Sequence, residues 1–267
     1  MTQSTRPAAI ADYAFIARLF PELAVPDPFP SEAAFATEVL PWAIVGLLDG
    51  TPTGYAFYRL YGETAHVVHL VVDRASRGRR LGEVLLAEVE RRAKAAGCTR
   101  WYLNVKRENT AAIRLYTRRG FRKEATSWAL RVPWPVADAV GPDERARTFV
   151  PTDADDAALQ ERFGMPPHRM AMLRARPGTS LLALEQDGAV VAFAAVDACY
   201  PGAYPFRATR GELAGPLLRA LKPLADTAKH NFLYVTVEDD AAVARALTEG
   251  GSEVLYEVER MAYDFSP

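Results

Sequence analysis

The stretch SRGRRLGEVLL, residues 76–86, combines positive charge with backbone freedom at the start of a helix-like apolar run. Its arginines and glycines are Arg77, Gly78, Arg79, Arg80 and Gly82. A helix N-terminus exposes unpaired backbone N–H groups and a partial positive charge, so it favours anions. Glycines let such a backbone curl around a phosphate, and arginines neutralise the charge that remains. The spacing alone leaves two interpretations open, a phosphate-binding loop and an arginine-rich surface turn.

A second stretch, NTAAIRLYTRRGF, has the signals of a short capped helix. Asn109 is a typical N-cap and Gly120 a typical helix stop. Ala112 is small enough for a ligand to approach the helix, and Tyr116 lies two turns beyond Asn109. A tyrosine with an unperturbed pKa of about 10 stays protonated at neutral pH and can act as an acid. Without further context, a tyrosine packed on the sheet is the favoured interpretation of Tyr116.

Together the two stretches resemble the GNAT superfamily of acyl-CoA-dependent acyltransferases. In that family an L-x-V strand leads, after a few residues, into [Q/R]-x-x-G-x-[G/A] at the start of a helix. Here Leu70 and Val72 match the strand, Arg77 the first loop position and Gly82 the last. Arg80 replaces the usual middle glycine, which makes the loop stiffer but keeps its N–H groups. The second stretch is similar to the family's N-x-x-A-x-x-x-Y-x-x-x-G-F helix.

The resemblance implies where acetyl-CoA, the expected cosubstrate, would bind. In the family, acyl-CoA lies between two splayed strands, with its pantetheine arm along the L-x-V strand and its pyrophosphate on the loop. The residues expected to bind it are Leu70, Val72, Arg77, Gly78, Arg79, Arg80, Leu81, Gly82, Asn109 and Ala112. The resemblance makes Tyr116 the expected general acid toward the sulfur of coenzyme A.

The general base is expected to be His66, because some family members carry a histidine or glutamate at about this place. In an unbroken strand His66 shares the face of Leu70 and Val72, whereas His69 faces the other way as a packed or surface residue. The alternative is that no dedicated base exists and that solvent deprotonates the amine.

The elements that must position these residues follow from hydrophobic periodicity. AHVVHLVVD reads as a dense apolar strand, and Leu81, Leu85, Val89 and Ala93 form one face of a helix ending before Gly97. RWYLNV predicts the next strand. Near the N-terminus the pattern predicts a helix from about Asp12 to Phe20, then a proline-rich connection and a helix capped by Ser31.

After residues 133–143, which have the composition of a linker, the same order of elements begins again. Aligning Asp240 with Asn109 also aligns Gly251 with Gly120, but it places Leu247 where Tyr116 stands. We therefore predict an α/β fold with a mixed sheet, made of two tandem GNAT-like domains, residues 1–134 and 145–267. The second is expected to be a degenerate copy without an active centre.

The totals exclude several other classes of protein. The formal net charge is −1, so a general nucleic-acid binder with a basic surface is not expected. There are 2 cysteines, Cys98 and Cys199, which suggests no disulfide framework, and Cys98 is expected to be a buried structural thiol. No metal spacing, membrane span or signal peptide is apparent, so we expect a cytoplasmic, metal-free protein, and a monomer whose two copies form an intramolecular pseudo-dimer.

The expected function is N-acetyl transfer from acetyl-CoA to a primary amine of a small molecule or protein; the alternative is a non-catalytic acyl-CoA sensor or scaffold. The connection PELAVPDPFPSEAAF, with Phe29, is a candidate lid over the acceptor. A cationic acceptor would favour carboxylates such as Asp27 or Glu32 beside it.

Overall fold

The computed structural model describes residues 2–25, 28–141, 145–165, 169–197, 200–225 and 229–265. The chain divides into two compact units, residues 1–124 with 260–267 and residues 125–259. Unit 1 contains the strands β1 (Gln3–Pro7), β2 (Ala43–Leu48), β3 (Thr51–Tyr61), β4 (Thr64–Val72) and β5 (Arg100–Lys106). Its helices are α1 (Tyr13–Leu19), α2 (Glu32–Ala34), α3 (Leu81–Ala95) and α4 (Thr110–Arg118), with a 3-10 turn, η2, at Phe20–Leu23.

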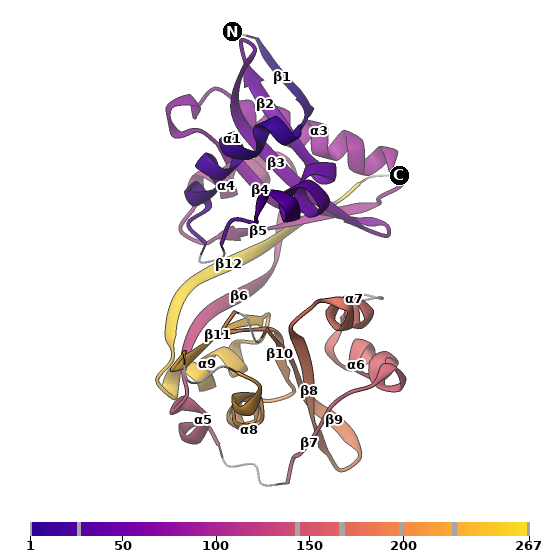
Figure 1. Cartoon of the computed structure of the whole chain (residues 1–267), viewed down its shortest axis with the longest axis vertical. Coiled ribbons are helices and arrows are strands. Elements are labelled where there is room, and N and C mark those ends of the chain that lie inside the picture. The colour runs from indigo at the N-terminus through magenta and orange to yellow at the C-terminus, as the bar shows by residue number, and fades with distance from the viewer. Residues whose placement is uncertain are drawn as a thin grey trace. The chain divides into compact units, whose positions relative to one another are not determined.

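The sheet of unit 1 has the order β1-β2-β3-β4-β5, and β12 (Glu253–Asp264) follows β5. Leu81, Leu85, Leu86 and Val89 of α3 pack on one face together with Tyr116 of α4. Ile16 and Leu19 of α1 pack on the other face with Phe35 and Tyr55. The two faces, called here the α3 face and the α1 face, therefore carry different helices (Figure 1).

Two features of β4 position the candidate site. Its antiparallel register with β3 shifts between Phe57/His69 and Tyr58/Val67, so Val68 is the extra residue of a β-bulge. Its parallel pairing with β5 runs from Thr64/Arg100 to Val67/Leu103, although both strands continue. Beyond the bulge, therefore, β4 and β5 diverge.

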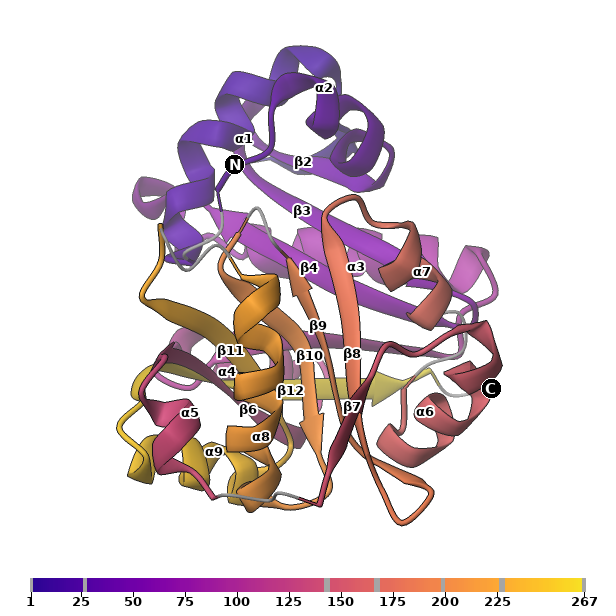
Figure 2. The same cartoon turned by 60° about the horizontal axis from the view of Figure 1, so that its bottom comes forward.

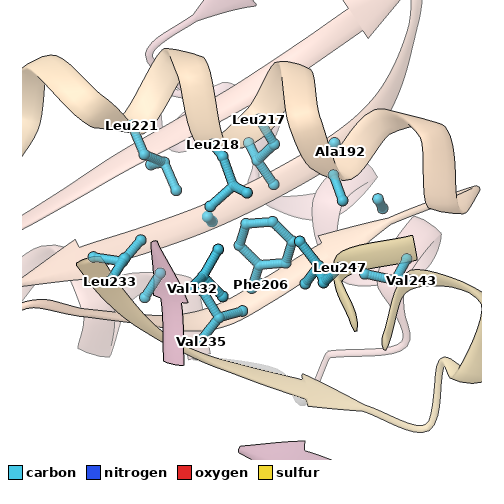
Figure 3. Close-up of a cluster of buried hydrophobic side chains, with 14 of the residues drawn as sticks. Val132, Ala192, Phe206, Leu217, Leu218, Leu221, Leu233, Val235, Val243 and Leu247 are labelled. Carbon is cyan, nitrogen blue, oxygen red and sulfur yellow. The ribbon is translucent and has the colours of Figure 1, made fainter. Parts of the chain in front are cut away.

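Unit 2 repeats this plan. Its strands are β7 (Arg147–Phe149), β8 (Thr179–Gln186), β9 (Ala189–Asp197), β10 (Gly202–Ala208) and β11 (Phe232–Glu238), joined by β6 (Arg122–Pro133). Its helices are α5 (Val136–Ala139), α6 (Asp156–Phe163), α7 (Arg169–Ala175), α8 (Ala214–Leu221) and α9 (Ala241–Glu249). Helices α5, α8 and α9 gather on one side of the strands, apart from α6 and α7 (Figure 2). In that core, Phe206 lies between the leucines of α8 and the β11 side chains Leu233 and Val235 (Figure 3).

The two units differ from the predicted boundaries in two ways. The described part of the predicted linker, residues 133–141, is structured: Trp134, Val136, Ala137 and Val140 are buried in the core of unit 2, because α5 presents its apolar residues to α8. The end of β12 belongs to unit 1, where Met261 and Phe265 join the core. Strand pairing and burial, rather than linker composition, decide these memberships.

The local helix signals are confirmed. Asn109 caps α4 by accepting from the N–H of Ala112 at 3.1 Å, and Asp240 caps α9 in the same way. Gly120 and Gly251 both have positive φ, at 90° and 105°, as a left-handed stop requires. The repeat register taken from the sequence is therefore correct at both ends of these helices.

In the ranges that the structure describes, no helix is long and apolar enough to cross a membrane. Cys98 is buried, and its thiol approaches the carbonyl of Gly62 at 3.8 Å. Burial raises the pKa of the Cys98 thiol, which fits a structural role. Cys199 lies outside the described residues.

Candidate functional site

The site is built at the open end of β4 and β5. Leu70 and Val72, the predicted L-x-V residues, pack toward the α3 face. No strand pairing with β5 is found for them in the described residues, since the pairing ends at Val67/Leu103. Parallel strands that separate leave a gap that can admit an extended ligand between them.

The loop after β4 leads into α3 with unusual backbone conformations. Gly78 has φ 78°, and Arg80, the N-cap of α3, has φ 60°. Within the described chain, the backbone N–H groups of Gly78, Arg80, Leu81 and Gly82 have no acceptor. These donors lie together at the N-terminus of α3, a helix of 15 residues. Unpaired N–H groups at the start of a helix are suited to bind an anion.

The predicted cofactor residues of this loop have unequal surroundings. Arg77, Gly78, Arg79 and Arg80 are exposed. The guanidinium of Arg77, however, pairs with Glu22 at 2.7 Å and donates to the carbonyl of Val72 at 3.1 Å. It therefore holds the loop, and its charge is compensated within the protein. The side chain of Leu81 is buried against Gly46 and Gly54, so only its backbone can face a ligand.

Gly82 and Ala112 are two small residues expected beside the cofactor. A Cβ on Gly82 would approach the Leu115 side chain to 3.2 Å, tighter than ordinary packing. Ala112 is half-buried and packs on the same core. The lack of a side chain at Gly82 thus lets the start of α3 lie against Leu115 of α4.

Tyr116 lies on the inner side of α4. It is 7% exposed and packs in the α3-face core, with its ring 5.9 Å from that of Phe121. Burial raises the pKa of the Tyr116 phenol above its ordinary value of about 10. The hydroxyl therefore stays protonated and is a hydrogen-bond donor throughout the physiological pH range.

The predicted face of His66 is wrong, whereas His69 lies opposite Leu70 and Val72 as predicted. The bulge at Val68 reverses the alternation of β4, so Ala65, Val67, Leu70 and Val72 all pack on the α3 face. His66 lies on the α1 face, stacked on Tyr102 of β5 with ring centroids 4.3 Å apart. His69 lies on that same face, against Phe20 and Phe57. The structure thus brings Tyr116, Leu70 and Val72 together and separates His66 from them by the sheet.

The predicted lid lies along the open end of the strands. Its first turn, η2, packs on β4, and Glu22 within it pairs with Arg77 of the loop. Lys106, at the end of β5, donates to the carbonyl of Ala24 just after η2. Glu32 is exposed, and Asp27 lies outside the described residues. The segment is therefore tied to both diverging strands.

The equivalent place in unit 2 is closed by side chains. Strands β10 and β11 also separate after Ala203/Val235, but Arg207 of β10 reaches the backbone carbonyl of Glu238 of β11 at 2.6 Å. Arg207 also pairs with the Glu238 carboxylate, which accepts from the Tyr204 hydroxyl at 3.1 Å. The gap between these strands is therefore bridged by an ion pair.

The start of α8, the counterpart of α3, is covered as well. A Cβ on Gly215 would fall 1.7 Å from the carbonyl oxygen of Val140, and one on Gly211 2.8 Å from that of Ala242. Leu247, at the position of Tyr116, is fully buried. In its described residues, unit 2 thus has neither the open strands nor the exposed helix start of unit 1.

Sequence reasoning missed the bulge, the Arg77–Glu22 pair and the surroundings of His69. The run AHVVHLVVD contains no glycine or proline to mark a bulge, and its apolar residues hide the change of face. His168, judged from the sequence to be a surface or lid residue, lies outside the described residues. Among the residues described, no group of three or more histidines, cysteines or carboxylates is placed to hold a metal ion.

Comparison with known proteins agrees with this geometry. The whole chain has the GNAT fold, as the solved structures below show. Residues 13–121 match the model of the acetyltransferase (GNAT) family, so the chain contains a GNAT acetyltransferase domain. That family supports acyl transfer as the class of reaction. A search of curated proteins gave no match.

Three solved structures resemble the chain over almost its full length. A GCN5-related N-acetyltransferase from Sphaerobacter thermophilus has TM-score 0.72 and 18% identity, with 99% of this chain and 96% of that chain covered. A putative acetyltransferase from Pyrococcus horikoshii has TM-score 0.69 and 16% identity, with 99% and 90% covered. A tandem GNAT protein from the clavulanic acid biosynthesis pathway has TM-score 0.64 and 17% identity, with 100% and 99% covered. The predicted tandem GNAT fold is thereby confirmed.

Proposed function

We propose that this protein is an N-acetyltransferase that transfers the acetyl group of acetyl-CoA to a primary amine of a small molecule or protein. The observation that carries the proposal is the divergence of β4 and β5 beside the α3 N-terminus, where four backbone N–H groups of the described loop have no acceptor. A diphosphate would accept from these groups and lie beside Arg79 and Arg80. The pantetheine arm would follow Leu70 and Val72 into the gap, and Asn109 and Ala112 would border it.

In the proposed reaction, the neutral amine nitrogen attacks the thioester carbon directly. The C–N bond forms, the C–S bond breaks, and the nitrogen loses a proton while the sulfur leaves as a thiolate. Backbone N–H groups near the bulge would stabilise the oxyanion. His66, on the α1 face, stays the proposed base, and its stacking on Tyr102 would fix the imidazole plane.

Tyr116 is proposed to donate to the departing sulfur from the α3 face. A free thiol has a pKa of about 8.5, lower than that of the buried phenol, so full proton transfer from Tyr116 to the thiolate is uphill. A hydrogen bond from the hydroxyl still stabilises the negative sulfur without that transfer. Burial therefore favours a Tyr116 that acts chiefly as a hydrogen-bond donor.

The proposal is tested with coenzyme A and the Tyr116→Phe variant. Calorimetry should give one coenzyme A site per chain, because unit 2 is closed. With a panel of amines and detection of free thiol, Tyr116→Phe should lower kcat by about 10- to 100-fold, the range of one hydrogen bond to a charged group. Its Kd for coenzyme A should stay within about twofold, since the ring and its packing remain.

The matched control is Tyr61→Phe, an exposed tyrosine at the far end of β3, which should leave both quantities unchanged. In the same assay His66→Gln should reduce kcat/KM if His66 is the base. Folded protein that takes up no coenzyme A would contradict the proposal. Binding without turnover of any amine, and no effect of Tyr116→Phe, would favour the sensor alternative.

A further inference from the structure

His69 occupies an aromatic enclosure on the α1 face of unit 1. Its ring centroid lies 5.3 Å from that of Phe57, 5.5 Å from that of Phe20 and 6.0 Å from that of Tyr55. Tyr55 is 0% exposed, whereas His69 is only partly buried. The edge of the imidazole that carries Nδ1 is therefore covered by Tyr55, and Nε2 lies on the other edge of the ring.

The contact with Tyr55 decides which ring nitrogen carries the hydrogen. In the described residues, the Tyr55 hydroxyl has a single polar partner, Nδ1 of His69 at 3.4 Å. A buried hydroxyl hydrogen without an acceptor is costly, so Tyr55 donates and Nδ1 accepts. Burial lowers the pKa of His69 to about 4 and raises that of Tyr55 above its ordinary value, so both groups are neutral near pH 7. The hydrogen of the neutral imidazole is then on Nε2.

The Nε2–H group of His69 lies on the side of the site where the amine substrate is expected to enter, called here the acceptor side. His69 follows the bulge at which β4 leaves β5, and it lies across the sheet from Tyr116. Phe20 belongs to η2, which Glu22 ties to Arg77 of the loop. An amine that reaches the thioester carbon from the face of the sheet opposite Tyr116 would therefore pass His69.

A second donor lies on the other side of the Phe57 ring. The guanidinium carbon of Arg59 is 5.2 Å from the centre of that ring, and Arg59 donates to the backbone carbonyl of Glu38 at 3.1 Å. Within the described ranges, no carboxylate forms an ion pair with Arg59. The acceptor side thus presents an imidazole N–H, a cation and aromatic rings, a combination that suits an oxygen-bearing ligand better than a bare cation.

Resting on the proposed function, we propose that His69, held by Tyr55 as the Nε2–H tautomer, donates a hydrogen bond to an oxygen of the acceptor. The acceptor class is then an amine with a carbonyl or carboxylate oxygen close to the reacting nitrogen, such as an amino acid or an amino-acid amide. His69 is a specificity-determining residue for this class. The thioester chemistry itself does not require it.

The experiment compares three matched acceptors on the full chain: L-phenylalanine, L-phenylalaninamide and 2-phenylethylamine. The first two have a carboxylate or a carbonyl beside the amine, and the third has neither. Both kcat/KM and the affinity of each amine for protein saturated with coenzyme A are measured. The oxygen-bearing amines should exceed 2-phenylethylamine by about 2- to 10-fold, the range of one net hydrogen bond between neutral groups. If L-phenylalanine is preferred over L-phenylalaninamide, the positive charge of Arg59 also contributes to recognition of the substrate oxygen.

Three variants test the residue. His69→Phe, which keeps an aromatic ring in the enclosure, should abolish the preference, whereas His69→Gln, whose amide N–H still donates, should retain most of it. Tyr55→Phe removes the hydroxyl that fixes the hydrogen on Nε2, so the imidazole can adopt either tautomer. This variant should give an intermediate preference. The matched control His230→Phe, in unit 2, should leave the preference unchanged, and the Kd for coenzyme A should be unchanged in all four.

The proposal is overturned if 2-phenylethylamine performs as well as the other two, if none of the three binds or reacts, or if folded His69→Phe keeps the preference. Failure of the proposed function looks different, because coenzyme A then fails to bind or no amine is acetylated at all.

Discussion

At the scale of single residues, unit 1 holds three titratable groups in neutral form by burying them. Tyr116 lies on the α3 face, and Tyr55 and His69 lie on the α1 face. Burial disfavours the charged form of each, so it raises the pKa of both tyrosines and lowers that of the histidine. Each group therefore stays neutral near pH 7 and can donate a hydrogen bond, but it does not exchange its proton readily with solvent.

The His69 pKa predicts a pH dependence of stability. The pKa of His69 is about 4 in the folded protein and about 6.5 when unfolded, so the unfolded chain binds the extra proton between these values. The stability that neutral His69 allows is present above about pH 6.5 and is lost as the pH falls toward 4. Between pH 7 and pH 4, the free energy of unfolding should fall by up to about 3 kcal/mol more in the wild type than in His69→Phe.

Urea unfolding at a series of pH values measures this difference. The two proteins need not have the same stability at pH 7, since only the pH-dependent part is compared. Parallel curves for the wild type and His69→Phe would show that His69 is not held neutral by burial.

At the scale of elements, the start of α3 depends on two left-handed residues of different kinds. Gly78 has φ 78° without steric cost, whereas Arg80 has φ 60° with a side chain. The arginine therefore supplies charge beside the N–H groups at the expense of backbone strain. A glycine, the usual residue of the GNAT loop motif at this position, would adopt this conformation without strain but would supply no charge.

The variants Arg80→Gly and Arg80→Ala separate these two effects. Both remove the charge, so both should weaken coenzyme A binding by up to about fivefold, as expected for one exposed ionic contact. Arg80→Gly also relieves the strain and should raise the free energy of unfolding by about 1 kcal/mol, whereas Arg80→Ala should not. Calorimetry and urea unfolding measure the two quantities. Equal stability of the two variants would mean that the left-handed conformation carries no cost.

At the scale of the whole molecule, unit 1 is completed by a strand from the far end of the chain, whereas unit 2 is one continuous segment. Residues 260–265 of β12 belong to unit 1, where the Phe265 ring lies 5.5 Å from that of the fully buried Trp101. Arg100 of β5 pairs with Asp264 at 3.0 Å. The core of unit 1 thus includes residues of β12 and the Phe265 that follows it.

A fragment of residues 1–134, the predicted N-terminal domain, lacks this strand. Losing buried Met261 and Phe265 removes several kcal/mol, about as much as the whole stability of many domains. We expect the fragment to show no cooperative thermal transition by circular dichroism, and residues 253–267 joined through a flexible linker to restore one. A cooperative transition of the unaided fragment at the midpoint of the full chain would contradict this.

Much of the site could be predicted because its signals are local. The arginine and glycine pattern of the loop, the Asn109 cap and the Gly120 stop each depend on neighbouring residues, and the structure has the expected helix ends there. The face of His66 could not be predicted, because one extra residue in an apolar strand reverses every side chain beyond it. The compensation of Arg77 by Glu22 joins residues far apart in sequence, which no local pattern reveals.

The sequence by itself determined the order of elements, their repetition, and the loss of the tyrosine in the second copy. These follow from periodicity and capping, whose range is a few residues. Only the tertiary structure decided that β12 completes unit 1, that Arg207 and Glu238 close the gap in unit 2, and that His69 and His66 share a face. Each of these depends on which distant strands pair and in what register, and that choice minimises the exposed apolar surface of the whole chain rather than of any one segment.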